Sequence, residues 1–178
     1  MIPDDRLNFK QLLKSIEAIV LDVDGVLSSS MVLIEPDGEL QRTTNVKDGF
    51  AIQLALRMGL KVAIITGGHS KAVVNRFRKI GVVDIYYKVS DKNIALNDFV
   101  NKHNLNLANV LYMGDDLLDY LVMQRVGMAT CPLDAAPEIK QISLYVSQYK
   151  GGEACVRDII EQVLRTQDKW MTKEAFVL

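Results

Sequence analysis

Two aspartates one residue apart end the first strongly hydrophobic run of the chain, in the stretch AIVLDVDGVLSSS. Residues 18–21 are all apolar, which is typical of a strand buried on both faces of a parallel sheet. Asp22 and Asp24 follow at the carboxyl end of this strand, where open α/β sheets bind their ligands. Because two neighbouring carboxylates repel each other, we expect a compensating positive charge, most simply a divalent metal ion.

Three further segments place polar residues where an apolar run stops. VAIITGG supplies Thr66 and Gly67, YKVSDK places Lys92 near the start of a helix, and YMGDD supplies Asp115 and Asp116. Each segment alone is equally typical of a turn, a helix cap or solvated surface. Because the carboxyl ends of parallel strands meet at one edge of a sheet, their ordered combination predicts a single polar site.

The elements that must position these residues alternate between strands and helices. Strands are expected at 18–21, 61–65, 82–87 and 109–114, with weaker ones near 127–130 and 144–146. Helices are expected at 4–15, 47–57, 71–80, 91–103, 117–125 and 153–165. Residues 31–34 and 40–44 flank an Asp-Gly turn and predict a β-hairpin. The fold class is therefore α/β: one domain over residues 1–178, with a doubly wound, mainly parallel sheet and a hairpin inserted after its first strand.

Composition excludes several kinds of partner. The formal net charge of the 178 residues is −1 and 49% of them are hydrophobic, which gives no electrostatic footprint for nucleic acid or an anionic membrane. No apolar run reaches the ~18 residues of a membrane span, and the N-terminus shows no signal-peptide pattern. The two cysteines, Cys131 and Cys155, are too far apart for a compact metal motif and are expected to be reduced thiols in a cytoplasmic protein.

The order of these motifs, DxDG, then Thr-Gly, then Lys, then GDDxxD, resembles the haloacid-dehalogenase-like phosphohydrolases over roughly residues 18–119. The stretches LDVDGVL, NVKDG, AIITG, VVNRF, SDK, MGDDLLDY and KGGEACVRD are similar to those of 3-deoxy-D-manno-octulosonate 8-phosphate phosphatases, enzymes of lipopolysaccharide sugar synthesis. Three positions depart from that group: Gly68 replaces an arginine or glutamate, Ala154 a glycine, and Leu121 a proline. The first departure bears on which sugar is bound.

The resemblance implies a covalent route for hydrolysis of a phosphate monoester. Asp22 would be the nucleophile that forms an aspartyl-phosphate. Asp24 would protonate the leaving oxygen and then activate water. Thr66 and Gly67 would hold phosphate oxygens, and Lys92 would add a positive charge beside the nucleophile.

The resemblance also implies Mg²⁺, a cation that prefers oxygen ligands and is commonly held by one or two carboxylates. Asp22 and Asp115 would supply carboxylates, Asp24 its main-chain carbonyl, and Asp116 a contact through water. Asp119 is expected to orient this loop.

The chain has no room for a cap domain over this site. Only 41 residues separate Asp24 from Thr66 and 25 separate Thr66 from Lys92, and the predicted hairpin, helices and strands use them up. The group resembled forms tetramers in which hairpins make a small barrel and a neighbour covers the site, so a homotetramer is implied here.

Sugar contacts are predicted from Asn45, Lys47, Asp48 and Arg76, where Arg76 matches the spacing of a carboxylate-binding arginine in that group. His69 lies near the site as a possible substrate contact or a plain helix-start histidine. Gly151, Gly152 and Arg157 are predicted to belong to a tail that reaches a neighbouring subunit.

Other functions remain open from the residues. A nine-carbon ulosonate 9-phosphate or a sialic-acid-type sugar phosphate would suit the same chemistry as the eight-carbon ester. A phospho-acceptor signalling domain gathers similar residues, but takes its phosphorylated aspartate from a middle strand. A non-catalytic regulatory subunit would not need both Asp22 and Asp24.

Overall fold

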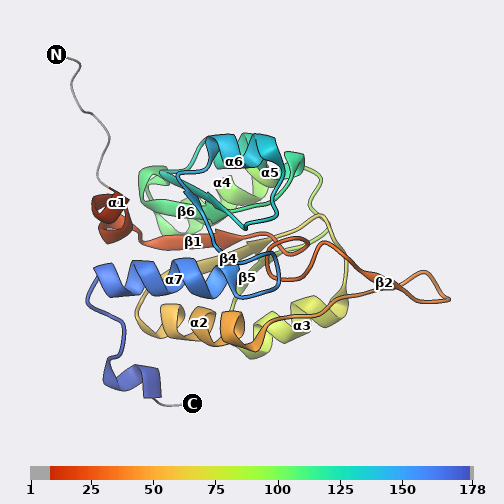
Figure 1. Ribbon diagram of the computed structural model, residues 1–178, viewed down its shortest axis with the longest axis horizontal. Helices are drawn as coiled ribbons and strands as arrows, with labels where there is room; N and C mark the ends of the chain where they lie inside the picture. The colour runs from red at the N-terminus through yellow and green to blue at the C-terminus, as the bar shows by residue number, and fades with distance from the viewer. Residues whose placement is uncertain (1–8, 177–178) are drawn as a thin grey trace.

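The computed structural model describes residues 9–176, which form a parallel sheet between two layers of helices (Figure 1). The six strands run in the order β5-β4-β1-β6-β7-β8, and every neighbouring pair is parallel. They are β1 (Ala18–Leu21), β4 (Lys61–Ile65), β5 (Asp84–Tyr86), β6 (Val110–Met113), β7 (Met128–Cys131) and β8 (Tyr145–Val146). The predicted doubly wound α/β fold is confirmed.

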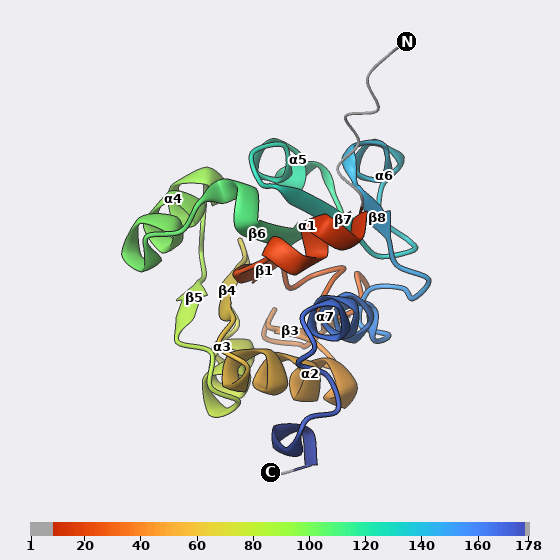
Figure 2. The same ribbon diagram turned by 90° about the vertical axis from the view of Figure 1, so that its left-hand side faces the viewer.

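Helices cover both faces of the sheet (Figure 2). One face packs against α1 (Phe9–Ser15), α2 (Val46–Arg57), α3 (Lys71–Lys79) and α7 (Cys155–Thr166), and the other against α4 (Lys92–His103), α5 (Leu117–Met123) and α6 (Pro137–Ile142). Side chains of β1 alternate between the two cores: Ile19 and Leu21 belong to the first, Ala18 and Val20 to the second. All four are fully buried, which explains why this strand reads as an unbroken apolar run.

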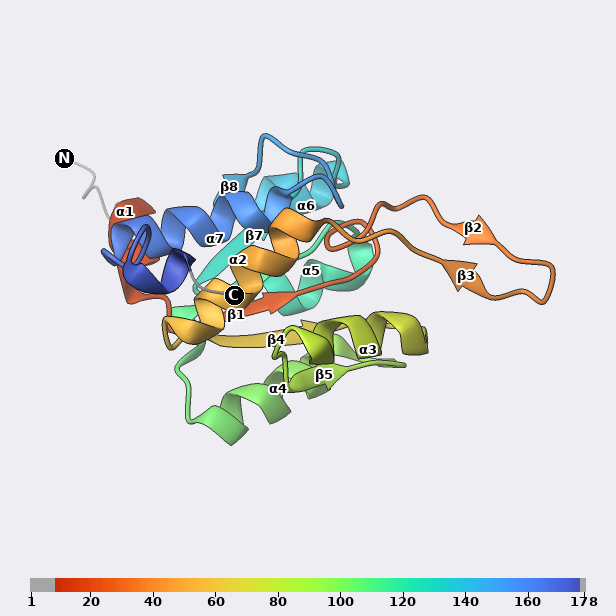
Figure 3. The ribbon, with the colours of Figure 1, turned by 90° about the horizontal axis from the view of Figure 1, so that it is seen from below.

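The predicted hairpin extends away from the body of the molecule (Figure 3). Its strands β2 (Leu33–Ile34) and β3 (Leu40–Gln41) pair over only two residues each, fewer than the predicted 31–34 and 40–44. A two-stranded arm without a third strand or a helix behind it buries little surface, so its ladder is short. Met31, Leu33 and Ile34 on this arm are 84%, 70% and 76% exposed.

Some elements differ from the sequence-based expectations. Helix α6 was not predicted, although its first residue, Pro137, is a typical helix start. The single-turn helices Leu107–Asn109 and Lys173–Phe176 were also not predicted. The predicted helix 4–15 is seen from Phe9 onward, and its first residues lie outside the described part. Within residues 9–176, no helix is long and apolar enough to cross a membrane.

Residues 151–155 form a strap over the loop that follows β1. The Gly152 amide donates to the Val26 carbonyl at 2.8 Å, and a Cβ on Gly151 would lie 2.0 Å from the Gly25 carbonyl oxygen. Only glycine therefore fits at position 151 without moving the loop. These residues thus make contacts within the chain, and their reach toward a neighbouring subunit stays a prediction. Arg157 likewise stacks over the Trp170 ring, 4.5 Å from its centroid.

Within the strap, Ala154 has a φ of +80° and precedes α7 without a side-chain cap. An L-residue with a Cβ is disfavoured in this left-handed region. We expect Ala154→Gly to raise the free energy of unfolding by about 0.5–1 kcal/mol, as relief of strain outweighs the added entropy of the unfolded chain. Urea unfolding measures this.

The matched control is Ala72→Gly in the first turn of α3, where the backbone is helical. It should lower stability by up to about 1 kcal/mol. A loss of stability in both variants would show that Ala154 is not strained.

Candidate active site

The predicted site residues gather where the direction of the sheet connections reverses, between β1 and β6. From β1 the chain continues to β4 and β5 on one side, and from β6 to β7 and β8 on the other. Such a switch point leaves a crevice at the carboxyl ends of the two strands. An open cavity of about 330 Å³ lies there, lined by Asp22, Asp24, Thr66, Lys92 and Asp115, among others. Asp22 and Asp115, 93 positions apart in the sequence, thus line one cavity, as predicted.

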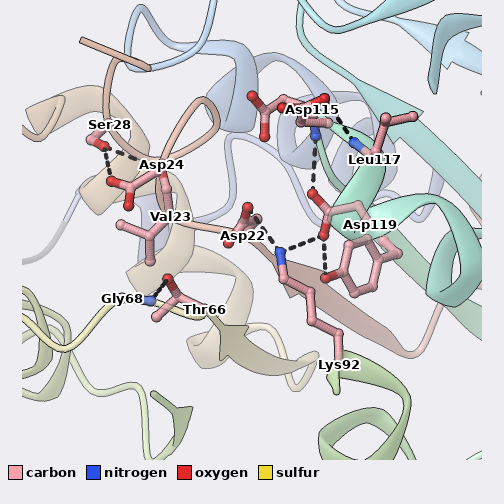
Figure 4. A network of polar contacts seen from close by, with 12 residues as sticks. Asp22, Val23, Asp24, Ser28, Thr66, Gly68, Lys92, Asp115, Leu117 and Asp119 are labelled. Atoms are coloured by element: carbon pink, nitrogen blue, oxygen red, sulfur yellow. Dashed lines mark hydrogen bonds and ion pairs between the residues drawn. The ribbon is translucent and has the colours of Figure 1, made fainter. Parts of the chain in front are cut away.

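Lys92 is the centre of a buried ionic network in this cavity (Figure 4). Its Nζ lies 3.0 Å from Asp22 Oδ2 and 2.6 Å from Asp119 Oδ1. Tyr112 donates its hydroxyl to the same Asp119 oxygen at 2.7 Å, and the Asp115 amide donates to Asp119 Oδ2 at 3.3 Å. Both oxygens of Asp119 therefore have partners. This geometry agrees with a role for Asp119 in orienting Lys92 and the Asp115 loop.

The carboxylates of Asp22, Asp115 and Asp119 are crowded enough to favour a cation. One oxygen from each lies within 4.8 Å of the others. Burial, and then the charge of Asp119, raise the pKa of Asp22 to about 7, against the opposing effect of Lys92. Burial, and then Asp119 and Asp116, raise the pKa of Asp115 to about 7. One lysine does not balance this negative charge, so the donor set fits a divalent ion with oxygen ligands.

Gly25 is required by the position of the Asp115 carboxylate. Its φ is +83°, and a Cβ on it would lie 1.9 Å from Asp115 Oδ2. The glycine of DxDG thus allows both the left-handed turn after Asp24 and the approach of the second carboxylate-bearing loop. The paired aspartates and the glycine belong to one site.

The loop after β4 is held in place by hydrogen bonds at both ends. The Gly68 amide donates to Thr66 Oγ1 at 3.0 Å, the Val89 amide to the Thr66 carbonyl at 3.1 Å, and the Lys88 amide to the Gly68 carbonyl at 2.9 Å. Thr66 is buried, whereas Gly67 is exposed at the cavity. The loop is therefore positioned to present its backbone to an anion beside Asp22.

Asp116 lies outside the cluster of three carboxylates. It is the N-cap of α5, its Oδ1 accepts a hydrogen bond from the Leu117 amide at 2.8 Å, and its side chain is exposed at the rim of the cavity. Asp116 thus caps α5, and its contact with metal through water stays a prediction.

Two of the predicted sugar-binding residues have structural partners instead. Asn45 is the N-cap of α2, accepts from the Lys47 amide at 2.8 Å and donates to the Gly152 carbonyl at 3.3 Å. Asp48 is 1% exposed and accepts from the Arg157 amide at 2.6 Å, at the start of α7. Burial raises the pKa of Asp48 to about 6. Both side chains thus have structural partners, one oxygen of Asp48 has none, and their contact with a sugar stays a prediction.

Arg76 lies in a larger cavity, of about 710 Å³, between the hairpin and α3. The basic side chains that line it are Arg42, His69, Lys71, Arg76 and Lys88, against one acidic side chain, Glu39. The exposed His69 lines this basic cavity, and its contact with substrate stays a prediction. Lys47 lines a different cavity, beside α7. The basic cavity is suited to an anionic ligand larger than phosphate.

Arg42 is a residue that sequence reasoning missed. Its Nε and Nη2 contact the Oδ1 and Oδ2 of Asp24 at 2.5 Å and 2.9 Å, a bidentate ion pair. No local pattern marks it, because its partner lies 18 residues earlier and only the return path of the hairpin brings the two together.

Comparisons with known proteins agree with this geometry. A family model described as haloacid dehalogenase-like hydrolase matches residues 70–157. The chain is 38% identical over 156 residues to the 3-deoxy-D-manno-octulosonate 8-phosphate phosphatase of Salmonella typhi, covering 88% of this chain and 83% of the relative.

Among solved structures is the phosphatase of the same name from Moraxella catarrhalis, in complex with magnesium, phosphate and KDO. It superposes on this chain with a TM-score of 0.87 at 29% identity, covering 90% of this chain and 92% of that one. A cobalt-bound phosphatase from Haemophilus influenzae superposes with a TM-score of 0.88 at 25% identity, covering 93% and 99%. The chain belongs to the 3-deoxy-D-manno-octulosonate 8-phosphate phosphatase family of haloacid dehalogenase-like hydrolases.

Proposed function

We propose that this chain is a Mg²⁺-dependent phosphatase that hydrolyses 3-deoxy-D-manno-octulosonate 8-phosphate to the free sugar acid and phosphate. The observation that carries the proposal is the meeting of Asp22, Lys92 and Asp115 at the switch point of the sheet. The substrate is inferred from the names of the relatives. The structure of one relative was determined in complex with magnesium, phosphate and KDO.

The residues of the chain divide the reaction between them. Asp22 attacks the phosphorus and the bond to the sugar oxygen breaks, while Asp24 gives that oxygen its proton. Asp24 then takes a proton from the water that hydrolyses the aspartyl-phosphate. Thr66 and Gly67 hold phosphate oxygens, and Lys92 keeps positive charge beside Asp22.

Asp22 and Asp115 would hold Mg²⁺ through their carboxylates, with the Asp24 carbonyl as a third ligand and Asp116 acting through water. The ion supplies positive charge that lets an anionic carboxylate approach a phosphate dianion.

The basic cavity beside α3 is the proposed sugar site. Arg76 would pair with the carboxylate of the sugar acid, with His69 nearby. Gly68 has no side chain where the group resembled carries an arginine or glutamate, which keeps a nine-carbon ulosonate 9-phosphate as the competing substrate.

We also infer that copies of the chain associate as a cytoplasmic homotetramer through the hairpin arm. The exposed apolar side chains of Met31, Leu33 and Ile34 support this, as does the absence of a cap among the described residues.

Phosphatase activity should depend on Asp22 as the nucleophile. Asp22→Asn is expected to lose about a thousandfold or more in kcat, because an amide does not attack phosphorus. Release of inorganic phosphate, with and without Mg²⁺, measures this. Asp37→Asn in the hairpin turn is the matched control and should keep full activity. Turnover by purified Asp22→Asn at the wild-type rate would contradict the covalent route.

Mg²⁺ should bind more tightly at pH 8 than at pH 6. With pKa values of about 7, Asp22 and Asp115 carry protons at pH 6 that the ion must displace. Because these pKa values are raised from 3.8, the metal-free fold loses stability as pH rises from about 4 to about 7, and Mg²⁺ restores it. Calorimetric titration should show affinity about tenfold or more higher at pH 8, with proton release at pH 6. Equal affinities would contradict the crowding of these carboxylates.

Gly25→Ala should abolish Mg²⁺ binding, because its Cβ would displace the Asp115 carboxylate. Gly38→Ala in the hairpin turn is the matched control. Its φ of +85° gives a similar backbone strain, and a Cβ there meets nothing within 4 Å. Both variants should lose about 1 kcal/mol of stability, and only Gly25→Ala should lose the thermal shift produced by Mg²⁺. Retention of that shift would place the ion elsewhere.

Arg76 should set the preference for a sugar acid. A charge-assisted hydrogen bond contributes roughly 1.5–3 kcal/mol, or about 10- to 150-fold in kcat/KM. Arg76→Ala should lose that factor for both the eight- and nine-carbon ulosonate phosphates, and change kcat/KM for glucose 6-phosphate little. Arg78→Ala, on the exposed side of the same helix, is the control. An equal loss for all three esters would leave Arg76 without a role in specificity.

A further inference from the structure

The hairpin reaches the active site through one side chain, Arg42. Besides its two contacts with Asp24, Arg42 donates Nη1 to the Leu40 carbonyl on its own arm at 3.0 Å. Its side chain is only 8% exposed, whereas that of Asp24 is 39% exposed. All three nitrogens of the guanidinium thus have partners, and they join the hairpin to the proposed acid–base residue.

This ion pair occupies both oxygens of Asp24. Oδ1 accepts from Arg42 Nε and from Ser28 Oγ, and Oδ2 accepts from Arg42 Nη2. In Figure 4 the Asp24 carboxylate points toward Ser28, away from Asp22 and Lys92. A group that serves a leaving oxygen beside Asp22 needs a free oxygen facing it. The hold of Arg42 must therefore loosen before Asp24 can act.

Arg42 also stands where an anionic substrate would enter. It lines the basic cavity of about 710 Å³. It also lies beside the loop after β4. A Cβ built on Gly68 would lie 3.6 Å from Arg42 Nη2 and 3.7 Å from Asp24 Oδ2. The guanidinium thus borders both the sugar cavity and the phosphate-binding loop. An incoming anionic group can take the same bidentate donors that Asp24 uses.

We propose that Arg42 is a positioning residue for Asp24, which holds both oxygens of this carboxylate until an anionic group of the substrate takes the guanidinium in its place. The proposal rests on the proposed function, because it needs Asp24 to act on the leaving oxygen. The hairpin would then act within its own subunit, because the substrate that enters also releases Asp24 from Arg42.

A double-mutant cycle tests the connection. With the eight-carbon sugar phosphate as substrate, Arg42→Gln should lower kcat about tenfold when Asp24 is present, because Asp24 then lacks the fixed starting orientation from which substrate entry turns it toward the leaving oxygen. In an Asp24→Asn background the same substitution should change kcat less than about twofold. KM should rise about tenfold in both backgrounds, because a positive charge facing the substrate is lost.

Arg42→Lys separates charge from geometry. A lysine keeps the charge but makes a one-point contact, so KM should stay within about threefold of the wild type while kcat falls as in Arg42→Gln. Arg78→Gln, which removes an exposed arginine on α3, should change neither constant. Thermal unfolding of each variant shows whether the fold is intact.

Equal loss of kcat from Arg42→Gln in both Asp24 backgrounds would overturn the proposal, as would an unchanged KM. Hydrolysis of p-nitrophenyl phosphate by the wild type separates the two levels of inference. If the wild type hydrolyses the esters but Arg42→Gln lowers kcat equally in both Asp24 backgrounds, only the role of Arg42 is overturned. A wild type that hydrolyses neither ester with Mg²⁺ overturns the proposed function and this proposal together.

Discussion

Electrostatic repulsion at the carboxyl ends of β1 and β6 is the constraint on which the rest of the site depends. Asp22, Asp115 and Asp119 bring oxygens within 4.8 Å of one another at a largely buried position. Such an arrangement is costly unless positive charge is close. Lys92 is buried with them and contacts two of the three, so its place at the first turn of α4 is fixed by the charge it must balance.

The hydrophobic core makes this crowding possible. Because β1 is buried on both faces, its end cannot move outward to relieve the repulsion. The glycines at positions 25 and 114 then remove the bulk that would keep the loops apart, since a Cβ on Gly114 would lie 2.5 Å from the Asp119 side chain. Apolar packing and small residues together hold charged groups closer than they would lie in water.

Local sequence patterns predict those features of the site that depend on residues close in the sequence and on the topology of the sheet. The bounds of β1 and β4 follow from apolar runs, and the convergence of Asp22, Thr66, Lys92 and Asp115 follows from parallel topology. Residues whose role depends on a distant backbone were not identifiable in this way. Asp48, for example, looks like a polar residue of an exposed segment, and only the docking of α7 shows that it is buried against the Arg157 amide.

Arg42 is a second case of the same kind. An arginine just after a short strand is ordinarily a solvated surface residue, and no single helix or strand connects it to Asp24, so local periodicity does not link the two. The path of the hairpin alone turns it back into the cavity. Prediction from sequence thus succeeds for residues at strand ends and fails for residues carried there by a loop.

The strap formed by residues 151–155 has a consequence for the order in which the molecule is made. Every carboxylate of the cavity lies before residue 120, so the chemical groups emerge from the ribosome long before the strap does. Yet the loop after β1 is closed by Gly151, Gly152 and the Cys155 thiol, which donates to the Val26 carbonyl at 3.3 Å. A nascent chain released from the exit tunnel only as far as β8 has all the carboxylates of the cavity, but the loop that begins with Asp22 and Asp24 is not yet closed. The loop after β1 therefore closes beside the carboxylates only once α7 has been synthesised.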